Sequence, residues 1–232
     1  MLPAAGLILA LLGVPALQVA ARVFAAEPFR LWSRLAIWTL ASTVLAIAVV
    51  SYSDWRTNLG LMSSGWQSMP AALIAMVLTL AAWLAIQLLQ RALGGGTVID
   101  TDSFKTLAAT PFAYRVFLVL TAGVTEEVLY RGYGIGIGKL LLGGMPIALA
   151  LSLFIFVAAH FRWGMSHLLS VLWAGAVLSV LFAVTNSLLA CIVVHILVDA
   201  VGLLLAPFGM AWKAKRTRPV ASGVSPFIRD DV

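Results

Sequence analysis

The residues with the clearest capacity for chemistry lie in the stretch TAGVTEEVLYRG, which places Glu126, Glu127 and Arg131 inside an apolar run. A charge at membrane depth is costly, so it requires a partner or a function. Glu127 and Arg131 are spaced i, i+4 in the favourable acid-first order, and this pairing predicts a structural role for Glu127. Glu126 points to another side of the same helix, without a cation nearby in the sequence. An unpaired carboxyl roughly 16 Å deep in a bilayer is a candidate functional group.

Two other apolar runs carry polar side chains that lipid disfavours. His160 lies near the end of one run, and His195 and Asp199 share a helical face in another. At about 1.5 Å per residue, the depths of Glu126, His195 and Asp199 agree within the error of helix boundaries and tilt. His160 comes out much shallower, so its helix must tilt or continue past Arg162 to bring it to the others.

Glutamate, histidine and aspartate side chains at such depths are sufficient to hydrolyse an amide without a covalent intermediate. A carboxylate can take a proton from water and later return it, as general base and then general acid. One histidine can help to hold that water, and a second can donate a hydrogen bond to a developing oxyanion. The span serines lack an evident base at helical spacing and are interpreted as packing residues: Ser152, Ser166, Ser170 and Ser179.

The composition predicts the fold class that must position these groups. Of the 232 residues, 62% are hydrophobic and 10% are charged, whereas soluble domains carry about 25% charged residues. The apolar runs have helical span length and lack the alternation of barrel strands. We therefore expect an all-α, polytopic transmembrane helix bundle. The basic residues that give the net charge of +6 lie mostly at span ends, which indicates contact with membrane lipids and no nucleic-acid partner.

About seven spans are expected, in a single transmembrane domain over residues 1–208 with its catalytic core at about 110–205. A basic polar cytoplasmic tail would follow at 209–232. The expected spans are 2–24, 35–52, 69–90, 116–138, 145–161, 167–185 and 188–208, with polar connections at 53–68 and 91–114. Between Gly132 and Gly138, glycines at small-xxx-small spacing should let neighbouring helices approach closely. With seven spans, the positive-inside rule places the amino terminus outside and the carboxyl terminus in the cytoplasm.

Three motifs in this order resemble those of the CAAX protease and bacteriocin-processing family, also called Abi. The family motif EExxxR is similar to EEVLYR at 126–131, and FxxxH is similar to FVAAH at 156–160. The last motif, HxxxN, in which Asp is a known variant, is similar to HILVD at 195–199. The resemblance covers about residues 110–205, and three motifs on three spans are far more specific than one.

This resemblance implies an intramembrane glutamate-type endopeptidase that cleaves a membrane-associated peptide or protein. The implied site residues are Glu126, His160, His195 and Asp199, with Glu127 and Arg131 in support. Glu126 and His160 would activate the water, and His195 and Asp199 would line the oxyanion side. Ionised Asp only accepts hydrogen bonds, so Asp199 either donates in a protonated form or orients His195.

Other functions use the same residue types. The glutamate pair also fits a structural ion-pair staple, a proton relay or carrier, or a silent scaffold such as a bacteriocin-immunity protein. A zinc metalloprotease is less favoured, because the sequence lacks HExxH and its single cysteine, Cys191, is expected in the core. We therefore expect no cofactor. The short connections favour a bacterial inner-membrane enzyme acting on an unprenylated peptide or membrane protein.

Overall fold

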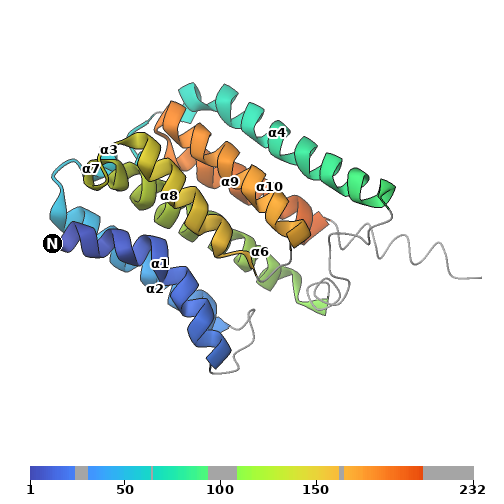
Figure 1. Cartoon of the computed structure of the whole chain (residues 1–232), viewed down its shortest axis with the longest axis horizontal. Helices are drawn as coiled ribbons and strands as arrows, with labels where there is room; N and C mark the ends of the chain where they lie inside the picture. Colours follow the sequence, from blue (N-terminus) through green and yellow to red (C-terminus); the bar gives the residue numbers. More distant parts are fainter. Residues whose placement is uncertain (24–30, 64, 94–108, 162–164, 206–232) are drawn as a thin grey trace, which may run out of the picture.

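The computed structural model of the chain describes residues 1–23, 31–63, 65–93, 109–161 and 165–205 (Figure 1). Every secondary-structure element within these residues is helical, which confirms the predicted fold class. The basic tail at 209–232 and most of the connection at 91–114 lie outside the described residues.

The first two helices form an antiparallel pair at one side of the bundle. Helix α1 runs from Leu2 to Val23 with Pro15 inside it, and α2 runs from Leu31 to Ser51. The two helices pack against each other along their length (Figure 1). Helix α2 begins earlier than the predicted start at residue 35, because Leu31 and Trp32 extend the apolar run.

The predicted polar connection at 53–68 contains more helix than expected. A short helix, α3, spans Trp55–Asn58, and α4 begins at Gly65 and continues to Ala92. The residues between them are tied to the turn between two later helices. The backbone N–H of Leu188 donates to the carbonyl of Gly60 at 2.8 Å. This anchoring accounts for the short connection, and the prediction that α4 starts near residue 69 was therefore too late.

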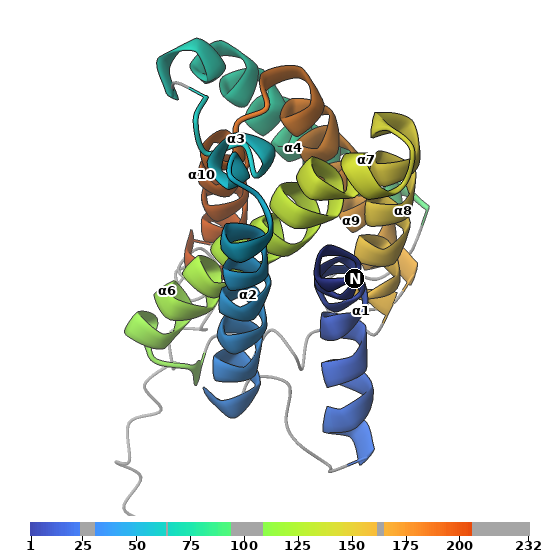
Figure 2. The ribbon, with the colours of Figure 1, turned by 90° about the vertical axis from the view of Figure 1, so that its left-hand side faces the viewer.

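A continuous helical stretch from Phe112 to Leu141 crosses the centre of the bundle. It comprises α6 (Phe112–Thr121), the π-helix η1 (Ala122–Ile137) and α7 (Gly138–Leu141). Element η1 packs against α1, α2, α8 and α10. Figure 2 shows this stretch running obliquely behind α2. The predicted span at 116–138 is thus helical, but most of it has π rather than α geometry, which is rare and concentrated at functional sites.

The predicted close approach at the glycines of η1 is confirmed. A Cβ atom at Gly134 would lie 3.0 Å from the Ser152 hydroxyl oxygen on α8. At Gly136 it would overlap the backbone carbonyl of Asn58 in α3. These small residues let α3 and α8 pack directly on the backbone of η1.

The remaining helices complete the bundle. They are α8 (Met145–Ala158), α9 (Met165–Thr185), α10 (Leu188–Ala200) and the short π-helix η3 (Val201–Leu205). The predicted turn between α9 and α10 is confirmed, with Asn186 at a φ of 46°. The Ser187 hydroxyl then caps α10 by accepting a hydrogen bond from the backbone N–H of Ala190 at 3.3 Å.

Five described helices are long and apolar enough to cross a membrane, which makes the chain a polytopic helical membrane protein. They are Leu2–Ala21, Leu31–Ser51, Trp66–Gln90, His167–Thr185 and Leu188–Leu205. The other two predicted spans differ from a standard span for identifiable reasons. Helix α8 has only 14 residues. Every 18-residue stretch within the continuous helix Phe112–Leu141 contains at least three charged residues, more than the two that a candidate span allows. The orientation and the domain division remain predictions.

Candidate active site

Glu127 lies at the centre of a buried polar network between η1, α9 and α10. Its Oε1 atom accepts hydrogen bonds from Arg131 Nη1 at 2.8 Å and from His195 Nδ1 at 2.7 Å. Arg131 Nη2 donates to the carbonyl of Gly175 in α9 at 3.0 Å. Both charged side chains are almost completely buried. The predicted pairing of Glu127 with Arg131 is confirmed, whereas the link from Glu127 to His195 was not predicted.

The bond to Glu127 determines how His195 can act. An ionised carboxylate only accepts, so Nδ1 carries the proton in this contact. The other ring nitrogen, Nε2, lies 3.6 Å from Asp199 Oδ2, which is beyond direct hydrogen-bonding distance. Nε2 therefore donates to an incoming group only when the imidazole carries both protons. The two flanking carboxylates, Glu127 and Asp199, are placed to stabilise that charged form.

His160 is oriented by the backbone of its own helix. It lies two residues beyond the end of α8, and its Nδ1 atom donates to the carbonyl of Phe156 at 2.8 Å. In the neutral ring, this bond leaves Nε2 as a hydrogen-bond acceptor. Nε2 lies 3.8 Å from Oε2 of Glu126, a distance at which a water molecule can bridge the two. Helix α8 ends at Ala158, and the turn that follows it brings His160 close to Glu126.

The four predicted catalytic residues come together in one region. Glu126 interacts electrostatically with His195 and Asp199 as well as approaching His160. Its side chain is 17% exposed, so it borders the buried network while remaining accessible. The sequence analysis found no cation near Glu126 along its own helix. The structure brings one from another helix, because Arg34 of α2 is within electrostatic reach of Glu126.

Phe156 lies between the Glu127 network, which includes His195, and the Glu126–His160 pair. The sequence analysis did not predict a role for it. The Arg131 Cζ atom lies 4.5 Å from the centre of its ring, a cation–π arrangement. The same ring packs against the ring of His160 at a centroid distance of 4.8 Å. Because its carbonyl also fixes His160 Nδ1, Phe156 contacts both the Glu127 network and the Glu126–His160 pair. The sequence did contain one indication of this role, because Phe156 is the first residue of FVAAH and lies one turn before His160.

Within the part of the chain that the structure describes, no group of three or more His, Cys, Asp or Glu side chains is arranged to hold a metal ion. Glu126 and His160 offer two suitable atoms, whereas a typical catalytic zinc has three protein ligands. Cys191 is buried in the core, as predicted.

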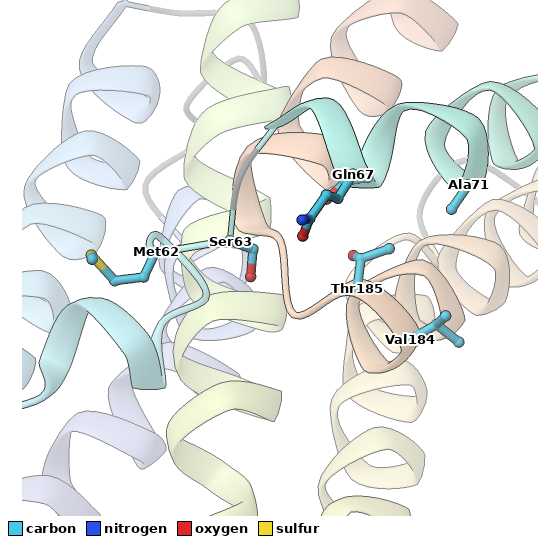
Figure 3. A pocket seen from close by; sticks show the side chains of 7 residues that line it. Met62, Ser63, Gln67, Ala71, Val184 and Thr185 are labelled. Atoms are coloured by element: carbon cyan, nitrogen blue, oxygen red, sulfur yellow. The ribbon is translucent and has the colours of Figure 1, made fainter.

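A cavity of about 480 Å³ lies elsewhere, beside the α3–α4 connection and the end of α9 (Figure 3). Its lining residues are Met62, Ser63, Gln67, Ser68, Ala71, Val184 and Thr185. No predicted site residue lines it, so this cavity is separate from the Glu126–His160 pair.

Residues 108–201 match a protein-family model described as type II CAAX prenyl endopeptidase Rce1-like. The chain carries an Rce1-like domain. This domain includes all six predicted site residues and agrees closely with the region of resemblance at about 110–205. The Rce1-like family is one of enzymes, and the match over residues 108–201 is a likeness to CAAX-type intramembrane proteases. No curated protein and no solved structure matches the chain.

Helices α1 to α4 precede the Rce1-like domain, and several hydrogen bonds join them to it, including two from the first two helices. Trp38 Nε1 donates to Thr121 Oγ1 at 3.0 Å, and the Tyr133 hydroxyl donates to the carbonyl of Pro3 at 3.0 Å. The first two helices therefore form part of the packing around η1.

Proposed function

We propose that the protein is an intramembrane endopeptidase that hydrolyses a peptide bond in a membrane-associated peptide or protein. The observation that carries this proposal is the 3.8 Å separation of Glu126 Oε2 from His160 Nε2, inside a CAAX-protease-like domain. Two acceptor atoms at this separation can hold one water molecule through both of its hydrogens.

In the proposed reaction, Glu126 removes a proton from the water while the water oxygen attacks the scissile carbonyl carbon. The carbonyl π electrons move to the oxygen and form a tetrahedral oxyanion. His195 in its doubly protonated form donates a hydrogen bond from Nε2 to this oxyanion. Asp199 helps to orient the imidazole ring of His195. Glu126 then returns the proton to the leaving nitrogen as the carbon–nitrogen bond breaks, which restores the carboxylate.

Glu127 and Arg131 support this chemistry without touching the reacting atoms. Glu127 fixes the ring of His195 through Nδ1, so that Nε2 is the nitrogen left for the substrate. Arg131 holds Glu127 in place and anchors it to α9 through Gly175. All six predicted site residues therefore have distinct roles in the proposal.

The proposed enzyme uses no metal ion, and its partners are membrane lipids and an unprenylated peptide or membrane-protein substrate. Its proposed location is a bacterial inner membrane, with the amino terminus outside and the carboxyl terminus in the cytoplasm. The test is cleavage of a peptide library by the purified protein in liposomes, with products identified by mass spectrometry. Substrate movement without cleavage would instead support a carrier, and loss of cleavage on chelation with recovery in zinc would support a metalloprotease.

A further inference from the structure

Tyr130 carries a buried hydroxyl that the proposed mechanism has not yet used. The residue is 1% exposed, and its ring packs edge-on against Phe156 with a centroid distance of 5.2 Å. Its backbone carbonyl accepts a hydrogen bond from the Ser152 hydroxyl at 2.7 Å, which fixes the main chain at this point. Within the described residues, the phenolic oxygen has no hydrogen-bond partner.

An unpartnered buried hydroxyl requires an explanation. Most buried polar groups in folded proteins are hydrogen-bonded, because an unsatisfied donor or acceptor lowers stability. The packing contacts of Tyr130 involve its ring, and phenylalanine would make them without introducing a polar atom. The oxygen is therefore best explained by a ligand or water that it binds during the reaction.

Tyr130 lies in the neighbourhood of the Glu126–His160 pair. Side chains on a helix lean toward its amino-terminal end, and Glu126 lies about one turn before Tyr130 on η1. The phenol interacts electrostatically with Glu126. On the other side, the Phe156 ring that contacts Tyr130 also packs against His160. Tyr130 is thus linked to Glu126 by an electrostatic interaction and to His160 through the ring of Phe156.

We propose that the Tyr130 hydroxyl is a third hydrogen-bonding group for the hydrolytic water, an inference that rests on the proposed function. Glu126 and His160 Nε2 both accept, so they use the two hydrogens of the water. The Tyr130 O–H donates to one lone pair of the water oxygen. The other lone pair is then directed at the scissile carbonyl carbon. The proton transfers and the bonds formed and broken remain those of the proposed reaction.

The test compares Tyr130→Phe with Tyr133→Phe in the full-length protein. Both substitutions remove one oxygen from a buried tyrosine of η1, but the Tyr133 hydroxyl donates to Pro3 and lies outside the proposed machinery. We expect Tyr130→Phe to lower kcat on the order of 10-fold to 100-fold, with KM unchanged and Tm equal to or above that of the wild type. Tyr133→Phe should lower Tm and leave kcat unchanged.

The rates are measured below the Tm of both variants, so that a loss of folded protein does not enter kcat. A wild-type enzyme that cleaves, with Tyr130→Phe at the same kcat, overturns this inference and leaves the proposed function intact. A fall in kcat of similar size in both variants also overturns it, because a general effect of η1 packing then explains the loss. Absence of cleavage by the wild type contradicts the proposed function itself, and the inference falls with it.

Discussion

At the scale of single residues, Glu127 organises the interior of the site. One carboxylate oxygen accepts hydrogen bonds from Arg131 and His195, which come from two different helices. Removing one member of such a buried ionic network leaves an uncompensated charge and costs more stability than the network contributes as a whole. Glu126, which is adjacent but more exposed, lacks a comparable set of contacts.

We expect Glu127→Gln to lower the free energy of unfolding by about 3–5 kcal/mol, because Arg131 would remain buried without its counter-charge. The matched control is Glu126→Gln, the same substitution at the neighbouring position, which should cost less than about 1 kcal/mol. Denaturant or thermal unfolding in detergent measures both values. Equal stability losses in the two variants would contradict the role given to Glu127.

Sequence spacing predicted the Glu127–Arg131 pair because both residues belong to one helical turn. It could not predict the bond between Glu127 and His195, because that contact joins residues on separate helices and depends on how each helix is rotated. The same limit applies to His160, whose predicted depth separated it from Glu126. The turn that follows α8 brings the two within 3.8 Å, and no residue pattern specifies that turn.

At the scale of elements, the π-helix η1 sets the positions of the EEVLYR residues. Its hydrophobic pattern predicted a helix at 116–138, but π geometry depends on backbone bonds to the fifth residue and leaves no evident period in this sequence. The glycines did carry a readable signal. At Gly134 and Gly136 the neighbouring elements come so close that no side chain fits without a shift.

We expect Gly136→Ala to destabilise the protein by about 1–3 kcal/mol, because the added methyl would overlap the carbonyl of Asn58. Gly202→Ala is the control, since a Cβ there meets no atom within 4 Å. That substitution in the short helix η3 should be neutral or slightly stabilising. Thermal unfolding of both variants in the same detergent provides the measurement, and a stable Gly136→Ala protein would show that α3 moves freely relative to η1.

At the scale of the whole molecule, the Rce1-like domain is packed with helices that lie outside the family match. Arg34 of α2 is within electrostatic reach of Glu126, and Trp38 hydrogen-bonds to Thr121. The number of helices that cross the membrane sets the orientation of this assembly. Five helices meet the length and composition of a span, and the sequence predicts two further crossings at α8 and at the α6–η1–α7 stretch.

With seven crossings, a tag at the amino terminus should be accessible from outside the cell, and one at the carboxyl terminus should be accessible only after permeabilisation. Labelling of single tags in intact and permeabilised cells measures this directly. Two tags on the same side would require an even number of crossings, and a cytoplasmic amino terminus would reverse the proposed orientation.

The most direct test of the proposed mechanism is the rate at which the protein in liposomes cleaves a peptide identified from the library, compared with that of Glu126→Gln. A glutamine cannot take the proton from water, so we expect kcat to fall by about 100-fold or more while Tm remains near that of the wild type. Cleavage at the wild-type rate by a folded Glu126→Gln protein would contradict the assignment of Glu126 as the general base.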